Sequence, residues 1–362
     1  MNTPELSVLM AVFNGEKYLK QAIESVLSQN MKEFEFIIID DGSTDGTASL
    51  IQAFGDPRIV YHFNKKNIGQ TSSLNLGLHM AKSALIARID ADDLYLQGKL
   101  QSQYDFMQRN PNIAVCGTWA HRLDHLGNRQ SVHYPVEPLD IRFRLLHNVP
   151  VCHVSVIMRK EAVIELGGYD ESFRFAADYE LWSRLEMNGF EIANIPKKLT
   201  VFRIMPDSFG SAQKVGPGAD ETARIIQKNI LNFTSELIPL EECRSIALLN
   251  HPGARLPTLS HFKVHFSLSR LANEVYVKVP FRVRSEQYAA LMWSLVKKYS
   301  LERASGSPPI LKNEFLAVKE LSDQRCLIGV SIWISILLSK FDSKHLLKIK
   351  GRLVTIGKVG SR

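Results

Sequence analysis

The chain has 362 residues, of which 45% are hydrophobic and 22% charged, and this balance predicts a globular protein with a sizeable core rather than a disordered or fibrous chain. Its four cysteines are scattered without a CxxC pair, which excludes a disulfide framework or a cysteine-based zinc site and favours a reducing compartment. The net charge is +7, but residues 326–362 hold seven Lys and Arg and one acid and so contribute +6 of it, which argues against a general nucleic-acid binder.

The first 110 residues alternate between buried strands and amphipathic helices. Nearly continuous apolar runs at residues 6–13, 34–39, 59–63 and 85–89 are typical of strands buried on both faces of a sheet. Between them, apolar residues recur at helical spacing, as in residues 19–27. This alternation predicts an α/β fold with a mostly parallel central sheet and helices on both of its faces.

Each of these predicted strands ends in polar residues. The four ends are Phe13–Asn14, Asp40–Asp41, Asn67–Gly69 and Asp90–Asp93. In open α/β sheets, ligands bind outside the carboxyl ends of the strands. We therefore expect the four polar ends to line one ligand site.

The fourth strand runs directly into three acids, Asp90, Asp92 and Asp93. Their mutual repulsion costs free energy unless a cation lies among them. Hard divalent ions such as Mg²⁺ or Mn²⁺ are held by one or two carboxylates, with water and substrate phosphates completing the shell. The stretch therefore predicts a metal-bridged diphosphate. A solvated acidic turn is the alternative, since Asp-x-Asp alone is a short motif.

Residues 111–218 show a mixed pattern of strands, loops and helices. The stretch 206–218 is rich in Gly, Pro and Ser without periodicity, and it is a candidate lid beside the site. The other elements expected here are a strand at 113–119, a polar loop through Gly127–Asn128, a short helix at 160–166, a helix from about Ala176, and two strands within 190–205 separated by a turn at Pro196–Lys198.

After about residue 218 the pattern becomes helical. We expect a helical extension at 219–303, a linker at 304–309 and a basic helical tail at 310–362. The apolar run Cys326–Leu338 is shorter than the ~20 residues that a membrane-spanning helix needs. Basic residues follow it, which favours peripheral contact of residues 326–352 with an anionic membrane; packing on the protein body is the alternative. Because no secretory signal precedes the first strand, we expect a cytoplasmic protein, peripheral on the cytoplasmic face of the membrane.

The motifs, taken in order, resemble those of the family 2 inverting glycosyltransferases. The resemblance covers about residues 5–215 and implies a GT-A fold that uses a nucleotide-diphosphate sugar. It implies a catalytic domain at 1–218, with a nucleotide half at about 1–110 and an acceptor half at about 111–218. The motifs that carry it are Ser7–Asn14, Asp40–Asp45, Asn67–Gly69, Asp90–Asp93, Gly167–Asp170 and Asp178–Trp182.

The resemblance implies donor-binding roles at the strand ends. Ala11 and Phe13 match positions that lay backbone and an aromatic ring against the nucleobase, and Asp41 matches a carboxylate that accepts a hydrogen bond from uracil. Asn67, in the third motif, belongs to the same expected donor site. Core packing is the alternative for Phe13, and a turn acid of the Asp-Gly kind is the alternative for Asp41.

In the acidic motif, the resemblance implies that Asp90 faces the ribose and that Asp92 binds the metal, Mn²⁺ or Mg²⁺. Asp93 is expected as a further metal ligand, with a supporting or capping role as its alternative. Arg88 shares a strand face with Asp90 and Asp92. It is therefore expected to pair with phosphate at the donor site or with an acid, and a structural ion pair is favoured.

Asp178 matches the family's catalytic base, which removes the acceptor hydroxyl proton while that oxygen attacks the anomeric carbon. The alternative is a helix N-cap, where Asp is common. His153 and Trp182 are predicted on the acceptor side of the pocket, with structural packing as the alternative for each. Three residues depart from the usual family pattern: Gln97, Lys99 and Met205.

These observations predict an inverting, metal-dependent glycosyltransferase of hexosyltransferase type. It would move a sugar from a UDP-linked donor to a glycan or lipid-linked glycan acceptor, as in bacterial-type cell-surface polysaccharide synthesis. A sugar nucleotidyltransferase is one alternative, but such enzymes usually carry a Gly-rich phosphate loop after the first strand, which Phe13–Glu16 does not supply. A non-catalytic scaffold with the same fold is the other, and the complete set of acids argues against it.

Overall fold

The computed structural model describes residues 3–204, 216–234 and 237–249. The chain divides into two compact units, residues 1–251 and 252–362. The second unit lies outside the described residues, together with the expected linker and basic tail, and so do residues 206–215 of the expected lid. The domain boundaries expected from the sequence stay predictions.

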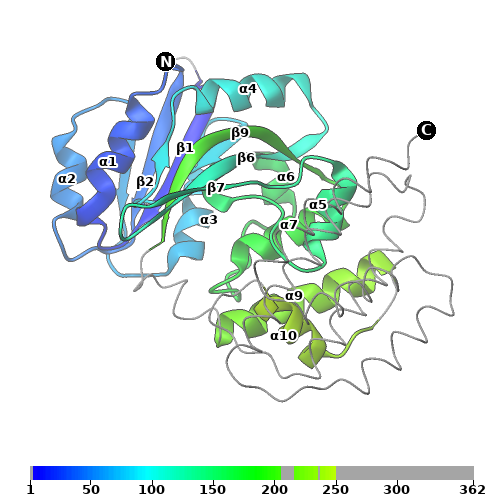
Figure 1. Cartoon of the computed structure of the whole chain (residues 1–362). Coiled ribbons are helices and arrows are strands. Elements are labelled where there is room, and N and C mark those ends of the chain that lie inside the picture. The colour runs from blue at the N-terminus through cyan, green and yellow to red at the C-terminus, as the bar shows by residue number, and fades with distance from the viewer. Residues whose placement is uncertain (1–2, 205–215, 235–236, 250–362) are drawn as a thin grey trace, which may run out of the picture. The chain divides into compact units, whose positions relative to one another are not determined.

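The first unit is organised around one nine-stranded sheet (Figure 1). Its strands follow the order β3-β2-β1-β4-β8-β6-β9-β5, and β7 pairs with β6. Strands β1 to β4 are parallel, whereas β8 runs antiparallel to β4 and β6, so the part of the sheet formed after residue 111 is mixed. The strands are β1 Leu6–Val12, β2 Phe34–Asp40, β3 Ile59–Phe63, β4 Leu85–Arg88, β5 Leu94–Tyr95, β6 Ile113–Asp124, β7 Arg129–Val132, β8 Ile157–Arg159 and β9 Glu191–Ile204.

Helices cover both faces of the sheet, as a βαβ alternation requires. Side chains of β1 alternate between the faces. Val8 and Met10 join Ile23 of α1 in the core, while Leu9 points to the other face and contacts α3 so closely that no Cβ would fit at Gly77. The helices are α1 Glu16–Leu27, α2 Thr47–Ala53, α3 Gln70–Met80, α4 Lys99–Arg109, α5 Pro138–Leu145, α6 Lys160–Glu165, α7 Ala177–Met187, α9 Pro217–Thr234 and α10 Leu240–Leu249, with a 3₁₀ turn at His153–Ser155.

The predicted fold class is confirmed, but the second half differs from the sequence prediction in three places. The strand expected at 113–119 extends to Asp124 and pairs with β7 in a hairpin whose loop contains Gly127 and Asn128, and α5 was not predicted. The expected turn at Pro196–Lys198 does not divide the strand, because β9 is continuous from Glu191 to Ile204. Its pairing with β6 jumps from Ile195 to Lys198, so Pro196 lies in a bulge, where its missing N–H breaks no ladder hydrogen bond.

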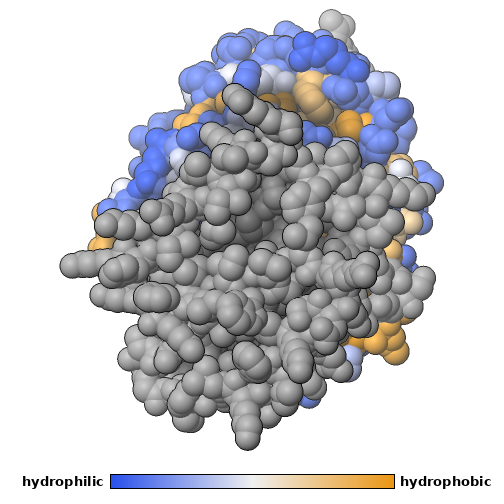
Figure 2. All heavy atoms as spheres, turned by 45° about the vertical axis from the view of Figure 1, so that its right-hand side comes forward, coloured by the Kyte–Doolittle hydropathy of each residue, from blue (hydrophilic) through white to orange (hydrophobic). Residues whose placement is uncertain are grey.

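Three of the four cysteines, Cys116, Cys152 and Cys243, are buried as free thiols. Within the described ranges, no helix combines the length and the apolar character needed to cross a membrane. The coloured part of the face in Figure 2 is mostly hydrophilic, with smaller hydrophobic areas between. The hydrophobic core itself lies between the sheet and its helices.

Candidate active site

The three acids after β4 form a compact turn. The Asp93 N–H donates to the Asp90 carbonyl at 3.2 Å, and carboxylate oxygens of Asp90, Asp92 and Asp93 all lie within 4.8 Å of one another. Burial, together with the charge of Asp90, raises the pKa of Asp92 to about 6. Burial and the charges of both neighbours raise the pKa of Asp93 well above its usual value. The turn thus concentrates negative charge that a cation would relieve.

Asp90 is held from two sides. Its Oδ2 lies 2.5 Å from Nη1 of Arg88, which is fully buried, and its Oδ1 accepts a hydrogen bond from Gln70 Nε2 at 3.0 Å. The structure therefore contains the ion pair that the shared strand face of Arg88 and Asp90 favoured. Among the described residues, Nε of Arg88 has no hydrogen-bond partner. Such a buried, under-satisfied guanidinium suits an anionic ligand beside the acids.

Arg203, near the end of β9, ties this strand to the acidic turn. Its N–H donates to Asp93 Oδ1 at 2.9 Å, and its Nη1 donates to the Asp92 carbonyl. The guanidinium also donates to Gln21 Oε1 at 2.7 Å and lies 4.6 Å from the centre of the Tyr18 ring. Because Asp93 is only 3% exposed and accepts a backbone N–H, its supporting role has a direct structural basis.

An exposed aromatic ring lies at the end of β1. Phe13 follows the last strand residue and is 49% exposed, so core packing, the alternative for this residue, does not describe it. Ile68, between β3 and α3, is 41% exposed. Ala11 is buried within β1, so only its backbone could face a ligand. The nucleobase-binding roles of Ala11 and Phe13 stay predictions.

Asp41 has a structural task at the next strand end. Its carboxylate is 2% exposed and accepts hydrogen bonds from Asn64 Nδ2, the Ile68 N–H and the Gly69 N–H, each at 2.9 Å. Gly42 has a φ of +78°, and a Cβ there would lie 2.8 Å from the backbone of Lys66. The Asp-Gly pair therefore shapes the loop after β3. The uracil contact predicted for Asp41 would have to use the remaining lone pair.

Three side chains in and just after the second motif shape the loop after β1. Ser43 Oγ accepts the Asn14 N–H at 2.9 Å, and Thr47 Oγ1 accepts the Gly15 N–H at 2.9 Å. Asp45 Oδ2 accepts the N–H of Glu16, the residue after Gly15, at 3.2 Å. The residues after Asp41 thus bind the start of α1 and hold the loop that carries Phe13. Asn67, in the third motif, is exposed, and its Oδ1 accepts the Gly69 N–H at 3.1 Å.

Asp178 lies in the first turn of α7, partly exposed. The N-cap of this helix is Ala176, so the N-cap alternative for Asp178 is wrong. The negative charge of Asp178 affects the pKa of two buried side chains, Tyr169 and Cys152, whose pKa the acids of the turn also affect. Burial is the main cause that raises the pKa of Tyr169, and the charges of Asp178 and Asp90 raise it further. Burial also raises the pKa of Cys152 to about 12, and the charges of Asp93 and Asp178 contribute to this rise. Asp178 and the acidic turn therefore flank the same buried residues.

The residues expected on the acceptor side form a polar and aromatic wall. His153 Nε2 and the Tyr169 hydroxyl lie 2.9 Å apart, and the Trp182 ring meets the His153 ring edge-on at 6.0 Å. Burial, with a further contribution from Arg88, lowers the pKa of His153 well below its usual value. Trp182 is fully buried, which favours its packing alternative over contact with an acceptor, whereas His153 is partly exposed.

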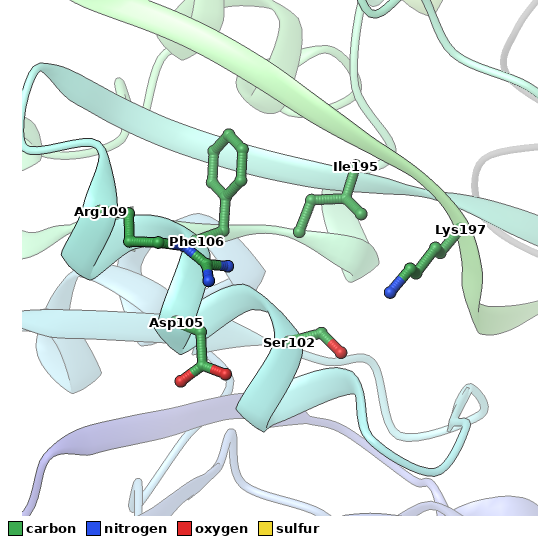
Figure 3. Close-up of a pocket in the computed structure, with 6 residues that line it drawn as sticks. All are labelled: Ser102, Asp105, Phe106, Arg109, Ile195 and Lys197. Atoms are coloured by element: carbon green, nitrogen blue, oxygen red, sulfur yellow. The ribbon is translucent and has the colours of Figure 1, made fainter.

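A separate cavity of about 190 Å³ lies between α4 and β9 (Figure 3). None of the predicted site residues lines it, so it is distinct from the site described above. Its walls are Ser102, Asp105, Phe106, Arg109, Ile195 and Lys197.

Comparison with known proteins agrees with this geometry. The family model "Glycosyl transferase family 2" matches residues 7–167. The putative glycosyltransferase EpsE of Bacillus subtilis is 34% identical over 211 residues, which are 57% of this chain and 75% of EpsE. An uncharacterized glycosyltransferase of Methanocaldococcus jannaschii is 31% identical over 210 residues, 56% of this chain and 72% of that protein. The chain belongs to glycosyltransferase family 2.

Solved structures show that the fold of this glycosyltransferase is of the GT-A type. The Staphylococcus aureus protein TarS, residues 1–349 in complex with UDP-GlcNAc, superposes with a TM-score of 0.55 at 19% identity, over 83% of this chain and 91% of that one. The mannosyltransferase PcManGT from Pyrobaculum calidifontis, in complex with GDP-Man and Mn²⁺, gives 0.50 at 15% identity, over 95% and 89%.

The partners of the site residues are what the sequence analysis of this glycosyltransferase missed. Gln70, Arg203 and Tyr169 contact or flank the predicted acids but belong to no local pattern with them. The available signals were that Tyr169 lies within the Gly167–Asp170 motif and that Arg203 lies near the end of a predicted strand. The donor, metal and catalytic roles assigned to individual residues stay predictions.

Proposed function

We propose that this glycosyltransferase is a metal-dependent inverting enzyme that transfers a sugar from a UDP-linked donor to a glycan or lipid-linked glycan acceptor in cell-surface polysaccharide synthesis. The main support is the acidic turn of Asp90, Asp92 and Asp93 beside Asp178, at the edge where parallel strands end. Both structural neighbours were solved with nucleotide-diphosphate sugars, UDP-GlcNAc and GDP-Man.

The acidic turn fits a hard divalent cation. Its ligands are carboxylate oxygens, and the pKa of Asp92, raised to about 6, reflects a burial and repulsion that a positive ion would offset. Asp92 would hold the ion with Asp93 as a further ligand, and Asp93 Oδ1 also accepts the Arg203 N–H and so secures β9. When bound, Mn²⁺ or Mg²⁺ would neutralise charge that develops on the diphosphate leaving group.

Asp178 is the proposed general base. In an inverting transfer, one carboxylate takes the proton of the acceptor hydroxyl as its oxygen bonds to the anomeric carbon and the bond to the diphosphate breaks. The partly exposed position of Asp178, beside Tyr169, suits this task. Phe13, exposed at the end of β1, would stack on the base of the donor.

The deciding experiment measures nucleotide release and product configuration in the purified full-length protein. We expect UDP rather than pyrophosphate to be released, the product to have inverted anomeric configuration by NMR, and EDTA to abolish turnover until Mn²⁺ or Mg²⁺ is added. Release of pyrophosphate would instead support a nucleotidyltransferase.

Two matched variants test the proposed base. Asp178→Asn should lose at least about 10²-fold in kcat. Asp170→Asn, in the loop before α7, should keep most activity, because Asn can still accept the Ser172 N–H as Asp170 does. Equal activity in the two variants would rule out the base.

We also propose peripheral contact of residues 326–352 with anionic lipid, which the basic composition of this segment supports. Flotation with vesicles that contain anionic lipid, compared with neutral vesicles, tests it. Equal recovery on both would contradict it.

A further inference from the structure

The chain just before the proposed base is bound by a carboxylate from another helix. Glu221 lies on α9 and is 6% exposed. Its Oε1 accepts the Arg174 N–H at 3.0 Å, and its Oε2 accepts the N–H groups of Phe175 at 2.8 Å and Ala176 at 3.0 Å. Three consecutive backbone donors thus converge on one side chain. A buried carboxylate is stabilised by such charge-assisted hydrogen bonds, and the three N–H groups orient the chain that donates them.

These donors lie directly before α7, whose first turn carries Asp178. The N-cap residue of α7 is Ala176, which has no side-chain acceptor, and no side-chain cap hydrogen bond is present at this helix. The direction in which α7 starts therefore depends on Arg174 to Ala176. Because Asp178 follows Ala176 by two residues, any shift of this segment moves the proposed base with it.

The other end of the same loop is bound by α3. Asn75 Oδ1 accepts the Tyr169 N–H at 2.8 Å, and Glu171 accepts hydrogen bonds from Ser72 at 2.8 Å and from Asn75 at 3.2 Å. Residues 169–176 therefore run from an anchor on the nucleotide half to an anchor on α9. Fixed at both ends, this loop leaves Asp178 little freedom relative to the acidic turn.

A second polar bridge joins α9 to α7, remote from the loop. Asn229 Nδ2 donates to Ser183 Oγ at 2.9 Å and to the Leu145 carbonyl at 2.6 Å. This bridge contacts the middle of α7 and none of residues 174–176. Asn229 also hydrogen-bonds the Tyr179 side chain, but Asn229→Ala leaves the N–H groups of residues 174–176 on Glu221, so it offers a control that loosens the same pair of helices without releasing that segment.

We infer that Glu221 is a positioning residue for glycosyl transfer: it fixes residues 174–176 and so sets the place of Asp178. The inference rests on the proposed role of Asp178 as base. It makes α9 part of the catalytic unit, although its sequence lies in the helical extension beyond the family motifs. Transfer depends on alignment of the base with the acceptor hydroxyl, and a misplacement of about 1 Å can cost 10²-fold in rate.

The test replaces Glu221 by Gln in the full-length protein. Gln has nearly the same shape, but it offers one acceptor oxygen, and its NH₂ group would face backbone N–H groups. We expect kcat to fall about 10- to 100-fold, with KM for the nucleotide sugar within about twofold of wild type. Amide hydrogen exchange at residues 174–179 should become faster.

Asn229→Ala is the matched control. It should lower the melting temperature while keeping kcat near wild type at 25 °C. A proportional loss of kcat and folded protein in both variants would mean a merely structural role and overturn the inference. Should Glu221→Gln fail to fold, Glu221→Asp retains the charge but shortens the side chain by one methylene, and the same fall in kcat at constant KM is expected.

The double variant Glu221→Gln/Asp178→Asn separates this inference from the proposed function. If Glu221 acts through Asp178, the double variant should be no slower than Asp178→Asn alone. Wild-type activity of Asp178→Asn would refute the base itself. An inactive Asp178→Asn together with wild-type kcat in Glu221→Gln would refute only the positioning role.

Discussion

Replacing Asp92 by Asn should stabilise the protein in the absence of metal. Burial, followed by the charge of Asp90, raises the pKa of Asp92 from 3.8 to about 6. Between these two pH values the folded protein binds more protons than the unfolded chain, so its stability falls as pH rises and the whole cost is present above pH 6. At 1.36 kcal/mol per pKa unit, the cost at neutral pH is about 3 kcal/mol. Because Asn carries no charge, Asp92→Asn removes this cost.

The assay is urea unfolding in EDTA, at two pH values, of wild type and Asp92→Asn. The variant should gain up to about 3 kcal/mol in free energy of unfolding at pH 7.5 and about half of that at pH 5. Mn²⁺ with UDP should then stabilise wild type by about 2.7 kcal/mol at one hundred times the dissociation constant, and leave the variant unchanged.

The control for this experiment is Asp45→Asn. Burial raises the pKa of Asp45, but hydrogen bonds from Thr47 and Glu16 outweigh it, so the net pKa is lowered. This substitution should therefore destabilise the protein at neutral pH. If Asp92→Asn proves less stable than wild type in EDTA, or if Mn²⁺ with UDP stabilises both proteins equally, the reasoning about the acidic turn is wrong.

Three further substitutions have definite expected outcomes. Burial lowers the pKa of Lys99 from 10.5 to about 7, so the stability of the protein rises with pH between these values. In urea titrations, Lys99→Met should therefore raise the free energy of unfolding by up to about 4 kcal/mol at pH 7 and by far less at pH 10. Phe13→Ala should weaken UDP binding by about 1–3 kcal/mol in calorimetry without changing the melting temperature, because the ring is half exposed. Arg88→Met should cost about 3–5 kcal/mol in unfolding free energy, because it leaves Asp90 without its buried partner.

The first 110 residues of the fold could be predicted because their signal is local. The apolar runs of β1 and β2 are buried along their whole lengths, and helical periodicity marks α1 between them. In the second half, tertiary pairing decides the outcome. Pro196 is compatible with a continuous β9 only because β6 tolerates a bulge opposite it, and nothing near Pro196 in sequence states this.

The location of the site could be predicted from the sequence, but the hydrogen-bond partners of its side chains could not. Parallel strands bring their carboxyl ends together, so the convergence of acids at one sheet edge followed from their positions. The hydrogen-bond partners of these acids did not follow from their positions in the sequence. Glu221 binds residues 45 to 47 positions earlier, and Arg203 reaches an acid 110 positions away. An Asp-Gly motif looks the same whether its carboxylate faces a ligand or, as Asp41 does, holds the adjacent loop.

Burial and donor type sort the acids of this enzyme into two groups. Asp41, Asp93 and Glu221 are at most 6% exposed, and each accepts backbone N–H groups from a segment distant in sequence. Asp92 and Asp178 are partly exposed. A buried carboxylate held by backbone donors from a distant segment fixes that segment, whereas a partly exposed carboxylate can also bind an ion or accept a proton. Asp93 and Glu221 therefore fix the segments next to Asp92 and Asp178 through hydrogen bonds from residues distant in sequence.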